Sequence, residues 1–198
     1  MFGSPFEHFD AYEAGAGLPA GSVRRVIARS SEHGAWAALE RGELTMPEFC
    51  AALNAEGAAA GLTIDASEIM AMVGRGIGAH PEMIDAITRI RERGLRTAAL
   101  TNNWPSGDGT GSPPGLRSLD VFDVVVESAV EGMRKPDPRI YALTCERLGV
   151  EPADAVFLDD IGANLKPARA MGMTTIKVDD TAQALRDLGA VLGFALTR

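Results

Sequence analysis

The chain has 198 residues, of which 46% are hydrophobic and 23% charged, a composition typical of a folded globular domain rather than a disordered segment. Its 27 acidic and 19 basic side chains give a net charge of −8, which disfavours nucleic acid as a partner. Two distant cysteines, no signal-like first segment and no apolar run of about 18 residues predict a cytoplasmic protein without a disulfide framework or a membrane helix.

The first part of the chain is predicted to be helical. Aromatic residues three apart in residues 6–15 indicate a short amphipathic helix. Residues 18–78 contain no alternating β-branched run, which disfavours strands there. Within this stretch, Thr45 and Glu48 have the spacing of a capping box, and Pro47 occupies the first turn, so a helix is expected to begin at this point.

Helices and strands alternate four times after residue 79. The predicted helices are 81–94, 137–149, 164–172 and 181–189. The predicted strands are 95–101, 122–128, 154–160 and 174–178. Short apolar strands joined by helices indicate an α/β fold with a doubly wound parallel sheet, whose chemistry lies at the carboxyl ends of the strands. The segment 106–115 is rich in glycine, serine and proline and is predicted to be a loop.

Polar side chains follow three of the predicted strands. Thr101 and Asn102 end the first, Lys135 follows the second, and Asp159 and Asp160 end the third. Taken singly, these residues are typical of a turn, a solvated loop lysine and a helix N-cap. Together they could hold a phosphate and Mg²⁺, because hydroxyl and ammonium groups bind phosphate oxygens and carboxylates bind the hard cation.

Three stretches, TNNW, EGMRKPDPRIY and VFLDDIGANLKPARAMGM, resemble the haloacid dehalogenase-like hydrolase superfamily. The similarity is greatest to the branch that includes the amino-terminal phosphatase domain of soluble epoxide hydrolases. The resemblance implies a Rossmann-like core made of residues 1–17 and 79–198. It also implies that residues 18–78 form a helical cap, inserted after the first strand of the family's fold.

The resemblance also implies a role for each residue at the strand ends. Thr101 and Asn102 would bind the transferring phosphoryl group. Lys135 would neutralise the nucleophile and the phosphate, and Asn164 would orient Lys135 by hydrogen bonding.

The same resemblance implies a Mg²⁺ cofactor, with Asp160 as a direct ligand and Asp159 beside it. The substrate would be a small phosphate ester. In the family's reaction an aspartate attacks phosphorus to give an aspartyl-phosphate, which water then hydrolyses.

The attacking aspartate of the family has no counterpart before the helical insert. The one early aspartate, Asp10, lies in a helical pattern rather than after an apolar strand. The family's first strand would be central, between the strands that end at Thr101 and Asp159, and its loss would leave two buried edges unpaired. We therefore expect Met1 to be an internal methionine of a longer enzyme and the 198-residue chain to have little turnover.

Two other functions remain open on the sequence. One is a 2-haloacid dehalogenase, whose chemistry needs no Mg²⁺, so that Asp159 and Asp160 favour the phosphatase. The other is a non-catalytic module that keeps a phosphate or Mg²⁺ site for binding or regulation.

Overall fold

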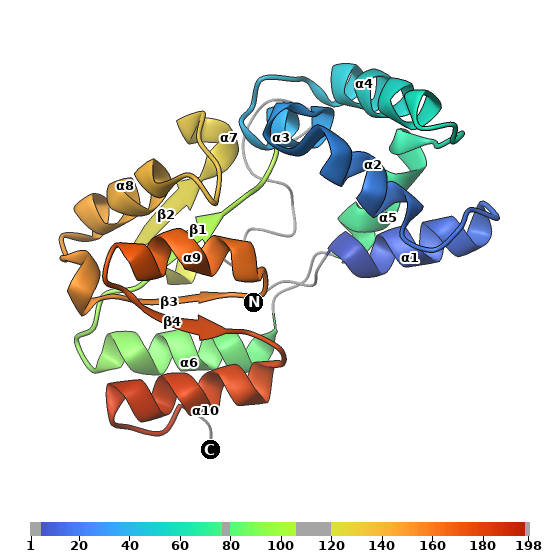
Figure 1. Ribbon diagram of the computed structural model, residues 1–198. Helices are drawn as coiled ribbons and strands as arrows, with labels where there is room; N and C mark the ends of the chain where they lie inside the picture. Colours follow the sequence, from blue (N-terminus) through green and yellow to red (C-terminus); the bar gives the residue numbers. More distant parts are fainter. Residues whose placement is uncertain (1–4, 77–79, 106–119, 197–198) are drawn as a thin grey trace. The chain divides into compact units, whose positions relative to one another are not determined.

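The computed structural model describes residues 5–76, 80–105 and 120–196 (Figure 1). These residues fall into two compact units. The helical unit contains the described residues up to Gly76 together with 103–105, and the α/β unit contains 80–102 and 120–196. The loop predicted at 106–115 lies outside the described residues. Among those described, no helix has both the length and the apolar character needed to cross a bilayer.

The helical unit consists of five helices and one 3₁₀ turn, as the sequence predicts for this stretch. They are α1 (Pro5–Gly15), α2 (Ser22–Ser30), the turn η1 (Ser31–His33), α3 (Ala35–Glu40), α4 (Met46–Ala59) and α5 (Ala66–Gly76). Thr45 and Glu48 form the predicted capping box at the start of α4, since each side chain bonds to the backbone N–H of the other. Phe9, Trp36 and Phe49 meet edge to face in a single aromatic core.

The first helix packs within the helical unit, which differs from the expected assignment of residues 1–17 to the core domain. Phe9 and Tyr12 are buried in the helical core, and α1 lies against α5. The buried carboxylate of Glu13 accepts hydrogen bonds from the backbone N–H groups of Gly21 and Val23, which ties α1 to the start of α2. Burial of these side chains fixes the position of α1.

The α/β unit contains the four predicted strands, each shorter at its ends than the apolar pattern. They are β1 (Ala98–Thr101), β2 (Val124–Glu127), β3 (Val156–Asp159) and β4 (Thr174–Lys177). The helices of this unit are α6 (Pro81–Glu92), α7 (Ser128–Glu131), α8 (Pro138–Leu148), α9 (Gly162–Ala170) and α10 (Thr181–Leu192), with a 3₁₀ turn η3 (Pro152–Asp154) before β3.

The strands form two parallel pairs instead of one continuous sheet. β1 pairs with β2, from Ala98 opposite Val124 to Thr101 opposite Glu127. β3 pairs with β4 in the same sense, from Val156 to Asp159. Among the described residues, no strand bridges the two pairs. The parallel α/β class is therefore as predicted, and one edge of β1 and one edge of β3 have no strand partner in the described chain.

Helices cover both pairs of strands. Phe157 of β3 and Val126 of β2 share one apolar cluster with Ile140 and Ala168, which come from α8 and α9. The opposite face of β3 and β4 packs against α6 and α10 (Figure 1). The side chains of β3 alternate accordingly, with Val156 and Leu158 in the second cluster and Phe157 in the first, as the two-residue period of a strand requires.

Candidate functional site

The predicted site residues meet at the carboxyl ends of β1 and β3. The ammonium group of Lys135 donates a hydrogen bond to the backbone carbonyl of Leu100 at 2.9 Å, next to Thr101. The same nitrogen forms an ion pair of 2.8 Å with the carboxylate of Asp159. Lys135 thus links the end of one strand pair to the end of the other. Only 12% of the Lys135 side chain and 3% of the Asp159 side chain are exposed.

Both oxygens of the Asp159 carboxylate accept hydrogen bonds within the protein. Its Oδ2 atom accepts from Lys135, and its Oδ1 atom accepts from the backbone N–H of Ile161 at 2.8 Å. Oδ1 also accepts from the side-chain amide of Asn164 at 3.0 Å. Asn164 was expected to orient Lys135 by hydrogen bonding, and its amide reaches Lys135 through Asp159, which accepts from both residues.

Asn102 fixes the main chain of the loop that carries Lys135. Its side-chain oxygen accepts from the backbone N–H of Lys135 at 2.8 Å, and its amide donates to the carbonyl of the same residue at 3.1 Å. The hydroxyl of the half-buried Thr101 makes only a long bond of 3.4 Å to the Asn102 carbonyl. A bond of that length is weak, so the Thr101 hydroxyl can exchange it for a ligand oxygen.

Two aromatic residues that the sequence analysis did not single out lie beneath this network. The ring of Phe157 faces the Lys135 ammonium, with 5.8 Å between the nitrogen and the ring centroid. Tyr141 packs edge to face on Phe157, and its hydroxyl donates to the Asn164 carbonyl at 2.7 Å. Burial, and secondly the charge of Asp159, raise the pKa of Tyr141, so this hydroxyl stays protonated. The sequence feature that could have identified Tyr141 is the stretch EGMRKPDPRIY, which ends at this residue.

Asp160 is the carboxylate at this edge that remains open to solvent. Magnesium is typically bound by one or two carboxylates, with water and phosphate oxygens completing the octahedron. Asp160 fits that requirement as a single ligand, whereas the oxygens of Asp159 are taken by N–H donors. No group of three metal-ligating side chains occurs within the described ranges. The donor set is therefore compatible with Mg²⁺ that keeps most of its ligands from water and phosphate.

Asp10 lies in α1 of the helical unit, where its carboxylate forms a 2.8 Å ion pair with Arg24. At the end of β3, the carboxylate of Asp159 is blocked by Lys135 and Asn164. In the part of the chain that the structure describes, we therefore identify no carboxylate suited to be the nucleophile at the ends of β1 and β3.

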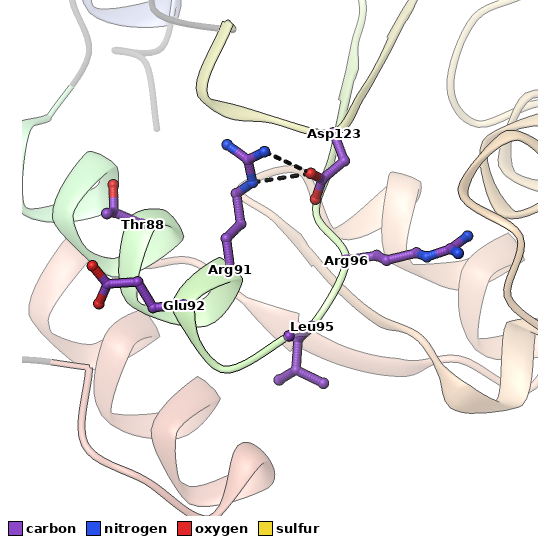
Figure 2. Close-up of a pocket in the computed structure, with 7 residues that line it drawn as sticks. Thr88, Arg91, Glu92, Leu95, Arg96 and Asp123 are labelled. Carbon is purple, nitrogen blue, oxygen red and sulfur yellow. Dashed lines mark hydrogen bonds and ion pairs between the residues drawn. The ribbon is translucent and has the colours of Figure 1, made fainter.

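A surface pocket at the other end of β1 contains none of the predicted site residues. Figure 2 shows Thr88, Arg91, Glu92, Leu95, Arg96 and Asp123 around it. The guanidinium of Arg91 turns to Asp123, with which it pairs at 2.8 Å (Figure 2). Arg96 extends away from that pair and donates to the Leu148 carbonyl. Both arginines are thus engaged in structural contacts, which leaves the Lys135 network as the candidate site.

Comparison with known proteins identifies the family and the fold. A family model described as a haloacid dehalogenase-like hydrolase matches residues 7–172. Acyl-CoA dehydrogenase family member 10 of Mus musculus is 39% identical over 182 residues, 90% of this chain and 17% of that protein. Bifunctional epoxide hydrolase 2 of Mus musculus is 43% identical over 126 residues, 62% of this chain and 22% of its own length. The chain therefore spans about a fifth of these two relatives. Other relatives carry the word phosphatase in their names.

Solved structures show the same fold. A family enzyme from Bacteroides thetaiotaomicron, crystallised with magnesium and inorganic phosphate, matches 90% of this chain and 88% of its own with a TM-score of 0.59. The two sequences are 20% identical, so the likeness concerns the fold alone.

Proposed function

Because the chain belongs to the haloacid dehalogenase-like hydrolases, we propose that its site serves a Mg²⁺-dependent phosphatase acting on a small phosphate ester. One observation carries the proposal. The Lys135 ammonium is held at the ends of β1 and β3, between the Leu100 carbonyl and Asp159. A buried cation fixed at two points, near the weakly bonded hydroxyl of Thr101, can bind an anion without first having to be ordered.

The residues at this edge have complementary tasks in the proposal. Thr101 and Asn102 bind oxygens of the phosphoryl group, Thr101 through its hydroxyl. The side chain of Asn102 holds the Lys135 main chain in place. Lys135 offsets the negative charge that gathers when an attacking carboxylate approaches the phosphate. Asp159 and Asn164 do not touch substrate and keep the ammonium at one position.

Asp160 is the residue we assign to Mg²⁺. When bound, the cation would neutralise part of the phosphate charge and polarise its P–O bonds. The proposal draws support from the exposure of Asp160 and from the family enzyme crystallised with magnesium and phosphate.

The attacking carboxylate belongs, in this proposal, to a strand between β1 and β3. The described residues contain no such strand, and each pair has an open edge there. A second candidate function follows from the same observation. Without an attacking carboxylate, the Lys135 network would bind phosphate and Mg²⁺ without turnover.

Binding of inorganic phosphate in the presence of Mg²⁺, measured by calorimetry, tests the site itself. Lys135→Met should weaken binding by at least about tenfold, because a charge-assisted hydrogen bond is lost. Lys166→Met is the matched control, since Lys166 is an exposed lysine of α9. Equal binding by both variants would contradict the assignment of Lys135.

Turnover of p-nitrophenyl phosphate separates the two candidate functions. Mg²⁺-dependent turnover would support the phosphatase. Phosphate binding without turnover would favour the binding module. Asp160→Asn should abolish the Mg²⁺ dependence of phosphate binding, and retention of that dependence would exclude Asp160 as the ligand.

A further inference from the structure

We propose that Tyr141 is a positioning residue for Lys135, holding the ammonium group through two separate contacts. One contact runs through the tyrosine hydroxyl and Asn164, and the other runs through the tyrosine ring and Phe157. The inference deepens the proposed function, because it concerns the same site. It stands on the geometry of the Lys135 network and not on activity.

The first contact is a chain of hydrogen bonds. The Tyr141 hydroxyl donates to the backbone carbonyl of Asn164 at 2.7 Å, and both groups are buried. The side chain of Asn164 donates to Asp159 at 3.0 Å. Asp159 in turn pairs with the Lys135 ammonium at 2.8 Å. A shift of the Asn164 backbone is therefore transmitted to the carboxylate that fixes Lys135.

The second contact is aromatic. The rings of Tyr141 and Phe157 meet edge to face, with centroids 5.2 Å apart and planes at 75°. The ring of Phe157 also faces the Lys135 ammonium, 5.8 Å from the ring centroid. Tyr141 thus supports the ring that the cation faces. Tyr141 is 1% exposed, so its side chain has no room to leave this position.

The backbone also connects Lys135 to Tyr141 over a short distance in the sequence. Helix α8, which carries Tyr141, begins three residues after Lys135, and Asp137 caps it by accepting from the N–H of Arg139. Lys135 and Tyr141 are therefore joined by one short, capped segment. The hydroxyl of Tyr141 donates a hydrogen bond from that segment to α9, which carries Asn164. Tyr141→Phe would keep the packing and lose this hydrogen bond.

The test measures how well Lys135 is shielded from acylation. The chain has three lysines, and Lys166 and Lys177 are exposed, so they serve as internal references. With limiting acetic anhydride and mass spectrometry, Lys135 should label slowly in the natural protein. We expect Tyr141→Phe to raise its labelling rate about fivefold relative to the references, because one hydrogen bond of the network is lost.

A matched control comes from the other tyrosine of the chain. Tyr12 is also buried, in the helical unit, and its hydroxyl accepts from the N–H of Asp65 at 2.6 Å. Tyr12→Phe removes one partly buried hydrogen bond far from Lys135 in the sequence, and it should leave the labelling ratio unchanged. If Tyr141→Phe loses stability like Tyr12→Phe but leaves Lys135 labelling unchanged, Tyr141 is merely structural and the proposal is overturned.

Phe157→Leu probes the second contact independently. It retains the tyrosine hydroxyl and removes the ring beneath the ammonium, and we expect it to raise Lys135 labelling also. If the labelling rate of Lys135 is unchanged in Phe157→Leu, the aromatic contact does not hold the ammonium group. Phosphate binding with Mg²⁺ is measured in parallel. If the natural protein binds no phosphate, the proposed function fails, while the labelling ratios still decide the role of Tyr141.

Discussion

The buried ion pair between Lys135 and Asp159 is costly to break but need not stabilise the fold. Both side chains are nearly excluded from water, and each would be costly to leave alone. The pair as a whole need not add stability, because desolvation offsets the attraction. Its presence in the core is better explained by placement of the ammonium at the strand ends than by a gain in folding free energy.

Lys135→Met should lower the free energy of unfolding by about 3 kcal/mol, because a buried carboxylate loses its counter-charge. Adding Asp159→Asn should restore part of that loss. Urea unfolding measures both changes. The control is Arg24→Met, which breaks an exposed pair with side chains 42% and 60% accessible and should cost less than about 1 kcal/mol. Similar losses in both single variants would show that the buried pair is solvated.

The sequence could predict which residues gather at the site but not how they bond. The positions after the strands identified Lys135 and Asp159, because parallel strands end at one edge. The bond from Asn164 to Asp159 instead of Lys135 depends on side-chain rotamers that no spacing specifies. Tyr141 and Phe157 were missed because apolar rings in a helix and a strand look like ordinary core residues.

At the scale of elements, the N-caps of α4 and α6 differ in whether a side chain makes the capping hydrogen bond. The Thr45 side chain caps α4, whereas His80, the N-cap of α6, makes no side-chain capping bond. Thr45→Ala should therefore lower the free energy of unfolding by about 1 kcal/mol, and His80→Ala should have a much smaller effect. Thermal unfolding followed by circular dichroism compares the two. Equal shifts would mean that the capping box adds nothing in solution.

The junction of α6, β1 and β2 should respond to acid. Backbone and side-chain hydrogen bonds from Thr97, and then the contact with Arg91, lower the pKa of Asp123. A carboxyl with a lowered folded-state pKa stabilises the fold above its unfolded pKa, and this contribution disappears as the pH falls through the lower value. The melting temperature of Asp123→Asn should lie below that of the natural protein at about pH 6, and the difference should narrow by about pH 3. A difference for Asp123→Asn that does not change with pH would mean that its carboxylate has no role in the junction.

Element types followed from the sequence more closely than element ends. All four strands in the second half lie where apolar runs predict them, but each is four residues long. The predicted runs are longer because apolar residues next to a strand also enter the core. Which strands pair with one another cannot be predicted from the hydropathy of each strand alone. Whether β1 joins β3 depends on what lies between them, and hydropathy carries no information on that.

For the whole molecule, the two units have separate apolar cores, and both tryptophans, Trp36 and Trp104, belong to the helical unit. Tryptophan fluorescence therefore reports on the helical unit alone. Phe49→Ala should lower the fluorescence midpoint in urea, at a cost of about 3–5 kcal/mol from the lost packing. Ile140→Ala, in the core of the α/β unit, should leave that midpoint in place and shift the circular dichroism curve. If both variants move both signals together, the units unfold as one.

Family membership was readable from three short stretches, and the family match confirms it. The boundary between units was harder to predict. The described residues 5–17 contain no strand, and the burial of Phe9 and Tyr12, which places α1 in the helical unit, is a tertiary property.

The open edges of β1 and β3 have a consequence for the behaviour of the protein in concentrated solution. Within the described ranges, one edge of each of these strands has no strand partner, and such an edge can template hydrogen bonding to another copy. At neutral pH the net charge of −8 makes copies repel one another, which opposes such encounters. Near the isoelectric point of about 4.9 this colloidal protection vanishes, so light scattering should rise there before the chain unfolds.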